Sequence, residues 1–226
     1  MHTSLRKAVL AGAIAAAAAA LAPAAHAISI VQNLSFGTQN VPFTNNFTFN
    51  LFDTTLGTLN AITIALTTSA TTDVNVVNLT GGPVSYSNAT AMVPVSVSGP
   101  GPVTVSTTPT AGPFSGVAVG LVTTIAGGTV SATSSMSVSN ALFGLHSGVG
   151  LDTGTLTASS SLGQYSGSAP GGTLSFGGDA TASGNFTLTY DYETSVVPVP
   201  GAALLLGSGL LMVFGLGRHA RRTTAV

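Results

Sequence analysis

The stretch Phe186-Thr187-Leu188-Thr189-Tyr190-Asp191-Tyr192 alternates large apolar residues with polar ones. Side chains of a strand point alternately to opposite faces, so this pattern predicts a strand with one buried face and one solvated, hydroxyl-bearing face. Shorter runs of the same kind recur at 47–51, 61–67, 74–76, 93–98, 103–105, 136–138 and 174–176. Many short strands of this type favour an all-β fold, namely an antiparallel β-sandwich or jelly-roll-like single domain.

Glycine- and proline-rich segments separate these runs and predict turns. They are Gly81-Gly82-Pro83, Gly99-Pro100-Gly101-Pro102, Gly112-Pro113, Gly127-Gly128, Pro170-Gly171-Gly172 and Gly177-Gly178-Asp179. Residues 139–146 form one weak helix candidate. The alternative to a folded body is low-complexity disorder, and residues 96–113 are its best local candidate.

Charge is scarce and unevenly placed. Charged residues make up 5% of the 226 residues, and all five Lys and Arg lie near the two ends of the chain. No Lys or Arg occurs between residues 28 and 217, whereas all six acids do. Nucleic-acid binding requires Lys and Arg to neutralise phosphates, so it is excluded as a function. The absence of cysteine excludes disulfides, thiolate catalysis and cysteine-based metal sites.

Residues 1–27 have the three parts of a secretory signal peptide. The pair Arg6-Lys7 is followed by an apolar centre at 8–21 and by Ala25-His26-Ala27, a small–x–small site for signal peptidase. We expect cleavage after Ala27, with Ile28 as the mature N-terminus. The alternative is an alanine-rich transmembrane helix.

The C-terminal residues 196–226 have the composition of a membrane anchor. The motif Val197-Pro198-Val199-Pro200 precedes an uncharged apolar run at 201–217, and three arginines follow it, Arg218, Arg221 and Arg222. As a helix this run would span about 25 Å, near the lower limit for a bilayer core. The arginines would stay cytoplasmic under the positive-inside rule, with the body outside. The alternative is a buried amphipathic helix.

This tail resembles the PEP-CTERM sorting signal of Gram-negative bacteria. The resemblance rests on Val197-Pro198-Val199-Pro200, on Leu206-Gly207-Ser208-Gly209-Leu210-Leu211 within the apolar run, and on Arg218-His219-Ala220-Arg221-Arg222. The family's Pro-Glu-Pro is here Pro198-Val199-Pro200, which bears on the efficiency of processing. The resemblance implies a substrate of an exosortase, a membrane transpeptidase that would cut near this motif and supply its own nucleophile.

The body, residues 28–195, resembles a choice-of-anchor E domain, a β-rich bacterial surface domain. The matching segments are Leu34-Ser35-Phe36, Phe52-Asp53-Thr54-Thr55-Leu56-Gly57-Thr58-Leu59 with the strand 61–67 after it, and Leu188-Thr189-Tyr190-Asp191-Tyr192-Glu193. No catalytic role comes with this resemblance.

Few residues of the body suggest chemistry. A hydrolase triad would need His146, a serine and an acid such as Asp152, but no Gly-x-Ser-x-Gly accompanies them. We expect His146 to be an ordinary loop or edge histidine, and we expect no catalytic residue, metal site or cofactor. Asp191 and Glu193 could form a weak calcium site, although charges that prevent edge-to-edge strand pairing explain them better.

The four tyrosines could stack on sugar rings. Tyr190 and Tyr192 are in phase with Phe186 and Leu188, so we expect these two in the core.

The sequence therefore predicts an exported, non-enzymatic surface or matrix protein. Its partners would be signal peptidase and exosortase during export, the membrane through its C-terminal helix, and an exopolysaccharide. The alternatives are a carbohydrate-binding module and an exported hydrolase.

Overall fold

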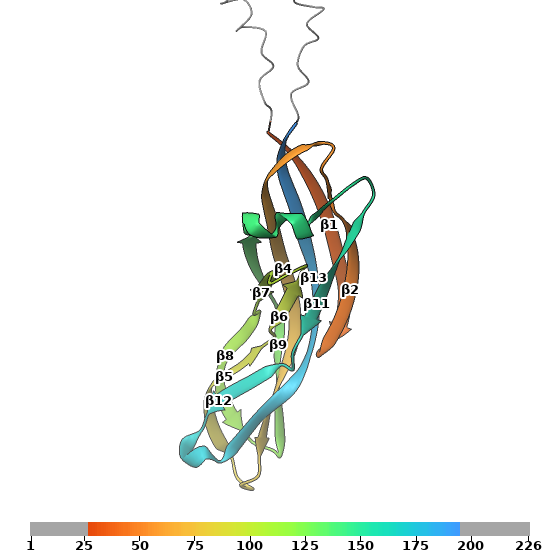
Figure 1. The fold of residues 1–226 in the computed structure, drawn as a ribbon. Coiled ribbons are helices and arrows are strands. Elements are labelled where there is room, and N and C mark those ends of the chain that lie inside the picture. Colours follow the sequence, from red (N-terminus) through yellow and green to blue (C-terminus); the bar gives the residue numbers. More distant parts are fainter. Residues whose placement is uncertain (1–26, 195–226) are drawn as a thin grey trace, which may run out of the picture. The chain divides into compact units, whose positions relative to one another are not determined.

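The computed structural model describes residues 27–194, and this part of the chain is all-β (Figure 1). Its longest strands form a four-stranded sheet of order β1-β13-β4-β9, here called the long sheet. Their bounds are Ala27–Asn40 for β1, Leu174–Thr194 for β13, Gly57–Asn78 for β4 and Val122–Ser137 for β9. β1 pairs with β13, and β4 pairs with β9, in antiparallel register.

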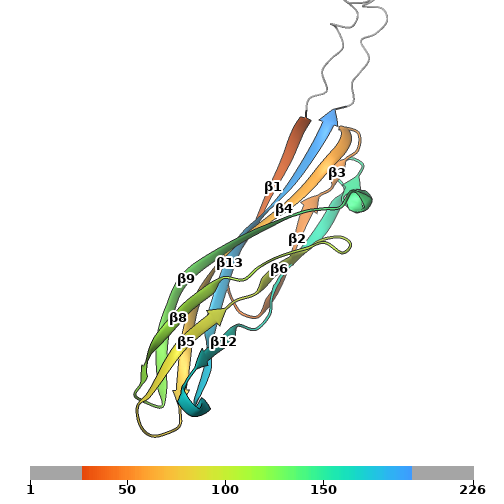
Figure 2. The ribbon, with the colours of Figure 1, turned by 90° about the vertical axis from the view of Figure 1, so that its left-hand side faces the viewer.

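Two smaller antiparallel sheets complete the fold. The first short sheet has the order β2-β11-β6-β7, with bounds Phe43–Asn50, Thr153–Ser160, Val95–Ser98 and Thr104–Thr107. The second short sheet has the order β12-β5-β8, with bounds Gln164–Ser168, Val84–Met92 and Thr110–Ala118. A short parallel pair joins β10 (Ser147–Gly148) to β3 (Phe52–Asp53). Figure 2 shows the long strands running past both short sheets, so the arrangement is sandwich-like, with a continuous layer and a divided one.

The larger hydrophobic core lies between the long sheet and the first short sheet. β4 contributes Ile62, Ile64 and Leu66, and the opposite layer contributes residues such as Phe49 and Leu156, all of them buried. Aromatic side chains contact one another across the layers: the ring centroids of Phe47 on β2 and Phe186 on β13 are 5.1 Å apart in an edge-on arrangement. Burial of these large side chains is the main favourable term for the fold.

A smaller core lies between the long sheet and the second short sheet. It contains Val74 and Val76 of β4 with Tyr86, Ala89 and Ala91 of β5, and Phe114, Ile125, Tyr165, Leu174 and Phe176 pack against it. The strands β4 and β13 contribute side chains to both cores. Residues 27–193 accordingly form a single compact unit.

The alternating runs predicted the strands but not their lengths. The runs 61–67 and 74–76 are parts of the single strand β4, and the runs 174–176 and 186–192 are parts of β13. Thr68 and Thr72 lie between the two runs of β4 and are buried, so polar residues on the inner face hid the continuity. Residues 96–113, the best local candidate for disorder, contribute to β6, β7 and β8.

Three of the six expected turns connect strands, at Gly81-Gly82-Pro83, at 99–102 and at Pro170–Gly172. The other three predictions were wrong, because those glycines lie inside strands. Gly112-Pro113 and Gly127-Gly128 occur at register shifts of β8 and β9, and Gly177-Gly178-Asp179 lies within β13. The weak helix candidate at 139–146 is realised as a 3₁₀ helix, η1 (Asn140–Leu145).

Candidate functional site

Most residues of the two expected targeting segments lie outside the described residues. This holds for Ala25 of the signal-peptidase site, for Val197, Pro198, Val199 and Pro200 of the sorting motif, for the expected helix 201–217, and for Arg218, Arg221 and Arg222. Ala27 and Ile28, which flank the expected cut, are the first two residues of β1. The cut itself stays a prediction.

His146 follows η1 in a bend, but its side chain is fully buried, unlike that of an ordinary loop histidine. Its ring lies 6.0 Å from the ring of Phe49, between centroids. Within residues 27–194 neither ring nitrogen has a hydrogen-bond partner of normal geometry. Burial lowers the pKa of His146, and the nearby backbone of Pro100 opposes part of this shift.

The triad considered for His146 is not assembled. The carboxylate of Asp152 accepts a hydrogen bond from the backbone N–H of Val149, at 3.1 Å, and not from the imidazole. A general base needs a partner that orients it and a nucleophile within hydrogen-bond reach. In the described part of the chain His146 has neither, and its surroundings are those of a core residue.

Asp191 and Glu193 lie on β13, which is flanked by β1 and β4 and is therefore not an edge strand. The explanation that these two charges prevent edge-to-edge strand pairing was therefore wrong. Instead, Asp191 accepts a hydrogen bond from the hydroxyl of Ser29 on β1. Among the residues described, no cluster of three or more His, Asp or Glu side chains could hold a metal ion.

Three of the four tyrosines belong to the cores. Tyr86, Tyr190 and Tyr192 are at most 9% exposed, which confirms the expectation for Tyr190 and Tyr192. The hydroxyl of Tyr190 donates to the backbone carbonyl of Asn50 at 3.2 Å, and burial raises the pKa of this phenol. Only Tyr165 is partly exposed.

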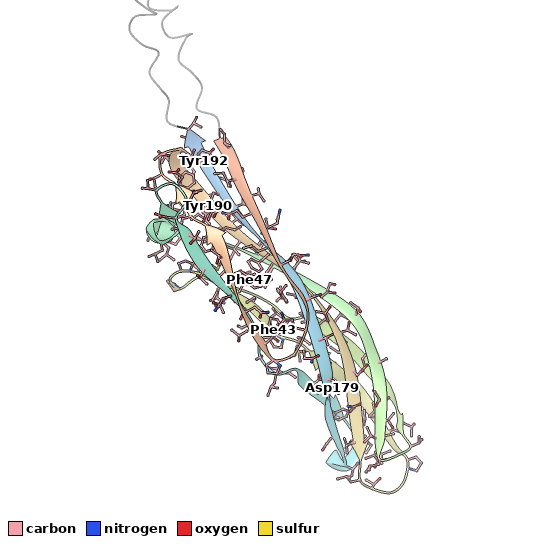
Figure 3. The ribbon with its side chains drawn as sticks, turned by 90° about the vertical axis from the view of Figure 1, so that its right-hand side faces the viewer. Phe43, Phe47, Asp179, Tyr190 and Tyr192 are labelled. Atoms are coloured by element: carbon pink, nitrogen blue, oxygen red, sulfur yellow. The ribbon has the colours of Figure 1, made fainter. Side chains whose placement is uncertain are left out.

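Tyr165 lines a surface hollow of about 530 Å³ at the side of the long sheet. The hollow lies where β1 leaves β13 and turns into β2, and the backbone N–H of Val41 in this turn donates to the carbonyl of Ala180 on β13 at 3.1 Å. Four segments far apart in the sequence supply its walls, and its lining residues include Val41, Thr72, Asp73, Leu162, Tyr165 and Asp179. Figure 3 shows Asp179 near the beginning of β13, well away from Tyr190 and Tyr192 near the end of the same strand.

Gly178 brings these walls together. A Cβ at this position would overlap the carbonyl oxygen of Asp73 and the ring of Tyr165, so only glycine allows the three segments to approach this closely. Its φ of 155° is also one that other residues rarely adopt. This close approach explains why glycine occurs in the segment Gly177-Gly178-Asp179, which was predicted to be a turn.

The hollow is polar and anionic. Asp73 and Asp179 are exposed, and both carboxylates raise the pKa of Tyr165 after the larger effect of burial. Thr72 is 1% exposed, and its hydroxyl has no partner in the described structure. This hydroxyl lies against Gly127 of β9, in the interior, and does not open into the hollow. The hollow therefore offers two carboxylates as hydrogen-bond acceptors, the phenol of Tyr165, and apolar surface at Val41 and Leu162.

The outer face of the long sheet carries ladders of short polar side chains. Cross-strand hydrogen bonds between β4 and β9 join Thr67 to Thr133, Ser69 to Ser131, Thr71 to Thr129 and Asn75 to Thr124, at 2.8–3.2 Å. Between β13 and β1, the hydroxyl of Thr187 donates to the side-chain oxygen of Asn33 at 2.8 Å. This face is rich in hydroxyl groups, and the carboxylates of Asp73 and Asp191 lie among them at positions of the same alternation.

Within residues 27–194, none of the helices has the length and hydrophobicity that crossing a membrane would require.

Comparison with protein-family models and with curated proteins found no match. Among solved structures, the chain is weakly similar to infectious bursal virus derived T=1 particles, with 9% identity and a TM-score of 0.15 over 78% of this chain and 47% of that one. A chain of the infectious bursal disease virus Gt strain gives 10% identity and a TM-score of 0.12 over 83% and 50%. The chain thus spans about half the length of these viral chains, and scores this low carry no argument about fold or function.

Proposed function

We propose that this chain is an exported, non-enzymatic bacterial surface or extracellular-matrix protein. In this proposal the body is a choice-of-anchor E-like domain, transiently held at the inner membrane by the 201–217 segment. An exosortase then processes it near Val197-Pro198-Val199-Pro200 and releases it to the cell envelope or matrix.

The observation that carries the proposal is the pairing of Ala27 with Glu193 across β1 and β13. Because these residues are partners at one end of the sheet, the expected signal-peptidase site and the expected anchor join the body at the same end. Removal of both segments would take only Ala27 from the strands of the body. This arrangement supports a domain that is delivered by two removable terminal segments.

The polar face of the long sheet also favours a surface or matrix role. Neutral hydroxyl and amide groups satisfy one another in cross-strand pairs, which suits a surface that stays hydrated among polysaccharide chains. The unassembled His146 and Asp152 give no support to the hydrolase alternative. The carbohydrate-binding alternative is favoured by one feature, the hollow lined by Tyr165, Asp73 and Asp179.

The test is intact mass and fractionation of the protein from its native host, alongside a Pro198→Ala/Pro200→Ala variant. The proposal expects a species that begins at Ile28, ends near residues 197–200 and lies outside the membrane fraction. The variant should keep its tail and remain with the membrane. Full-length tails in the membrane fraction of both strains would overturn processing by an exosortase.

A matched control is Pro170→Ala, which changes a proline of the described body at an exposed turn. This variant should be processed like the natural protein. Loss of processing in it as well would attribute the effect to misfolding, and the sorting motif would then need to be tested by changing Val199.

A further inference from the structure

We propose that the hollow beside Gly178 binds a neutral sugar residue of a polysaccharide. The first argument is the charge of the site. Asp73 and Asp179 are its only charged lining residues, and no Lys or Arg occurs between residues 28 and 217 to accompany them. An anionic ligand would be repelled, so the ligand must be a donor of hydrogen bonds or a cation.

The size and lining of the hollow favour a sugar over a cation. At about 530 Å³ it falls within the range of small-molecule sites, about 300–1,000 Å³. Calcium needs about six to eight oxygen ligands at close range, and the described part of the chain has no cluster of three acids. A hexose, in contrast, has several hydroxyl donors and an apolar C–H face, which match the two carboxylates and the apolar Leu162 and Val41.

Tyr165 supplies the surface on which a sugar ring would rest. Its ring packs against two glycines: a Cβ at Gly178 would come within 2.6 Å of the ring, and a Cβ at Gly163 within 3.1 Å. An aromatic ring with a polar tip offers an apolar face and a hydrogen bond at the same time. Tyr165 is also the one tyrosine that the cores leave partly exposed.

The test is calorimetric titration of the protein purified from its host with three neutral oligomers, cellohexaose, mannohexaose and isomaltohexaose. At least one should bind, and Asp179→Asn should weaken that binding by about tenfold or more, since a hydrogen bond to a charged group is lost. Tyr165→Ala should weaken it comparably. Asp191→Asn, which makes the same charge change on the same strand outside the hollow, should leave the affinity unchanged.

Three outcomes would overturn the inference. The first is that none of the oligomers binds at millimolar concentration. The second is that binding persists unchanged in Asp179→Asn and Tyr165→Ala, with folding verified by circular dichroism. The third is that calcium chloride alone binds and Asp179→Asn abolishes that binding. The inference deepens the proposed surface role, but the two fail separately. The titration reports on the hollow whatever the fate of the C-terminal segment, and the mass measurement reports on processing whatever the ligand.

Discussion

The hydroxyl groups of Thr68 and Thr107 lie 2.7 Å apart in the interior, where they join β4 of the long sheet to β7 of the first short sheet. Both residues are at most 5% exposed, so each hydroxyl depends on the other for its hydrogen bond. Thr68→Val leaves Thr107 with an unpaired buried hydroxyl and should lower the free energy of unfolding by about 1–3 kcal/mol. Urea unfolding measures this loss.

The double variant Thr68→Val/Thr107→Val is the control for that pair. Replacing both partners by apolar groups of the same shape removes the unsatisfied atom, so the double variant should be more stable than either single variant. Additive losses in the double variant would contradict the assignment of a mutually dependent pair.

His146 should make stability fall as the solution becomes mildly acidic. Its pKa in the folded protein is lowered from the ordinary 6.5, so the unfolded chain binds the proton more tightly. The free energy of unfolding then decreases as pH drops below about 7, with a slope of at most about 1.4 kcal/mol per pH unit. Urea unfolding between about pH 7.5 and 5 measures the slope.

His146→Phe removes this titrating group and keeps a ring beside Phe49. The variant should show a flatter pH profile over the same range. An identical decline in both proteins would mean that His146 is accessible to protons in the folded state, contrary to its burial.

Gly178 should be intolerant of a side chain, whereas its neighbour should not. Gly178→Ala forces a Cβ against the Asp73 carbonyl and the Tyr165 ring, and we expect a loss of about 1–3 kcal/mol of stability. Gly177→Ala meets no atom within 4 Å and is the matched control. Thermal unfolding of the two variants compares them directly, and equal midpoints would contradict the close approach.

Asn78 closes the turn between β4 and β5 through both ends of its amide. Its nitrogen donates to the carbonyls of Gly82 at 2.8 Å and Ala118 at 2.9 Å, and its oxygen accepts from Thr80. Asn78→Asp replaces a donor by a buried acceptor facing two carbonyls, so we expect a loss of about 2–3 kcal/mol near neutral pH. Asn75→Asp, on the outer face of the same strand, should cost far less in the same unfolding assay.

The alternation of residues 186–192, repeated in the shorter runs, was sufficient to predict an all-β fold, because burial of one strand face leaves a period-two pattern. The continuity of β4 was not predictable in this way. Thr68 and Thr72 occupy inward positions, where Thr68 finds its partner on a distant strand that no local pattern reveals. The glycines at 112, 127–128 and 177–178 were wrongly predicted to form turns, because glycine is favoured both at irregular points within a long strand and in turns between two strands.

The hollow could not be predicted from the sequence because its walls come from four distant segments. Tyr165 was one of four tyrosines considered as sugar platforms, and the alternating run correctly assigned Tyr190 and Tyr192 to the core. Tyr165 could be singled out only from the structure, which places it beside the corner where β1 leaves β13. The segment Gly177-Gly178-Asp179 was a local signal in the sequence, but its role depends on Asp73 of β4 and Tyr165 of β12, which lie against Gly178.

The central place of β13 has a mechanical consequence. If the protein is held through its C-terminal segment, as proposed, any pull enters the domain at Thr194 along the axis of a strand with neighbours on both sides. Such a force loads the hydrogen bonds to β1 and β4 in shear, all at once, instead of peeling them apart one by one. A domain tethered in this way would stay folded best against a force that pulls along β13, while it is still held at the membrane and before its anchor is removed.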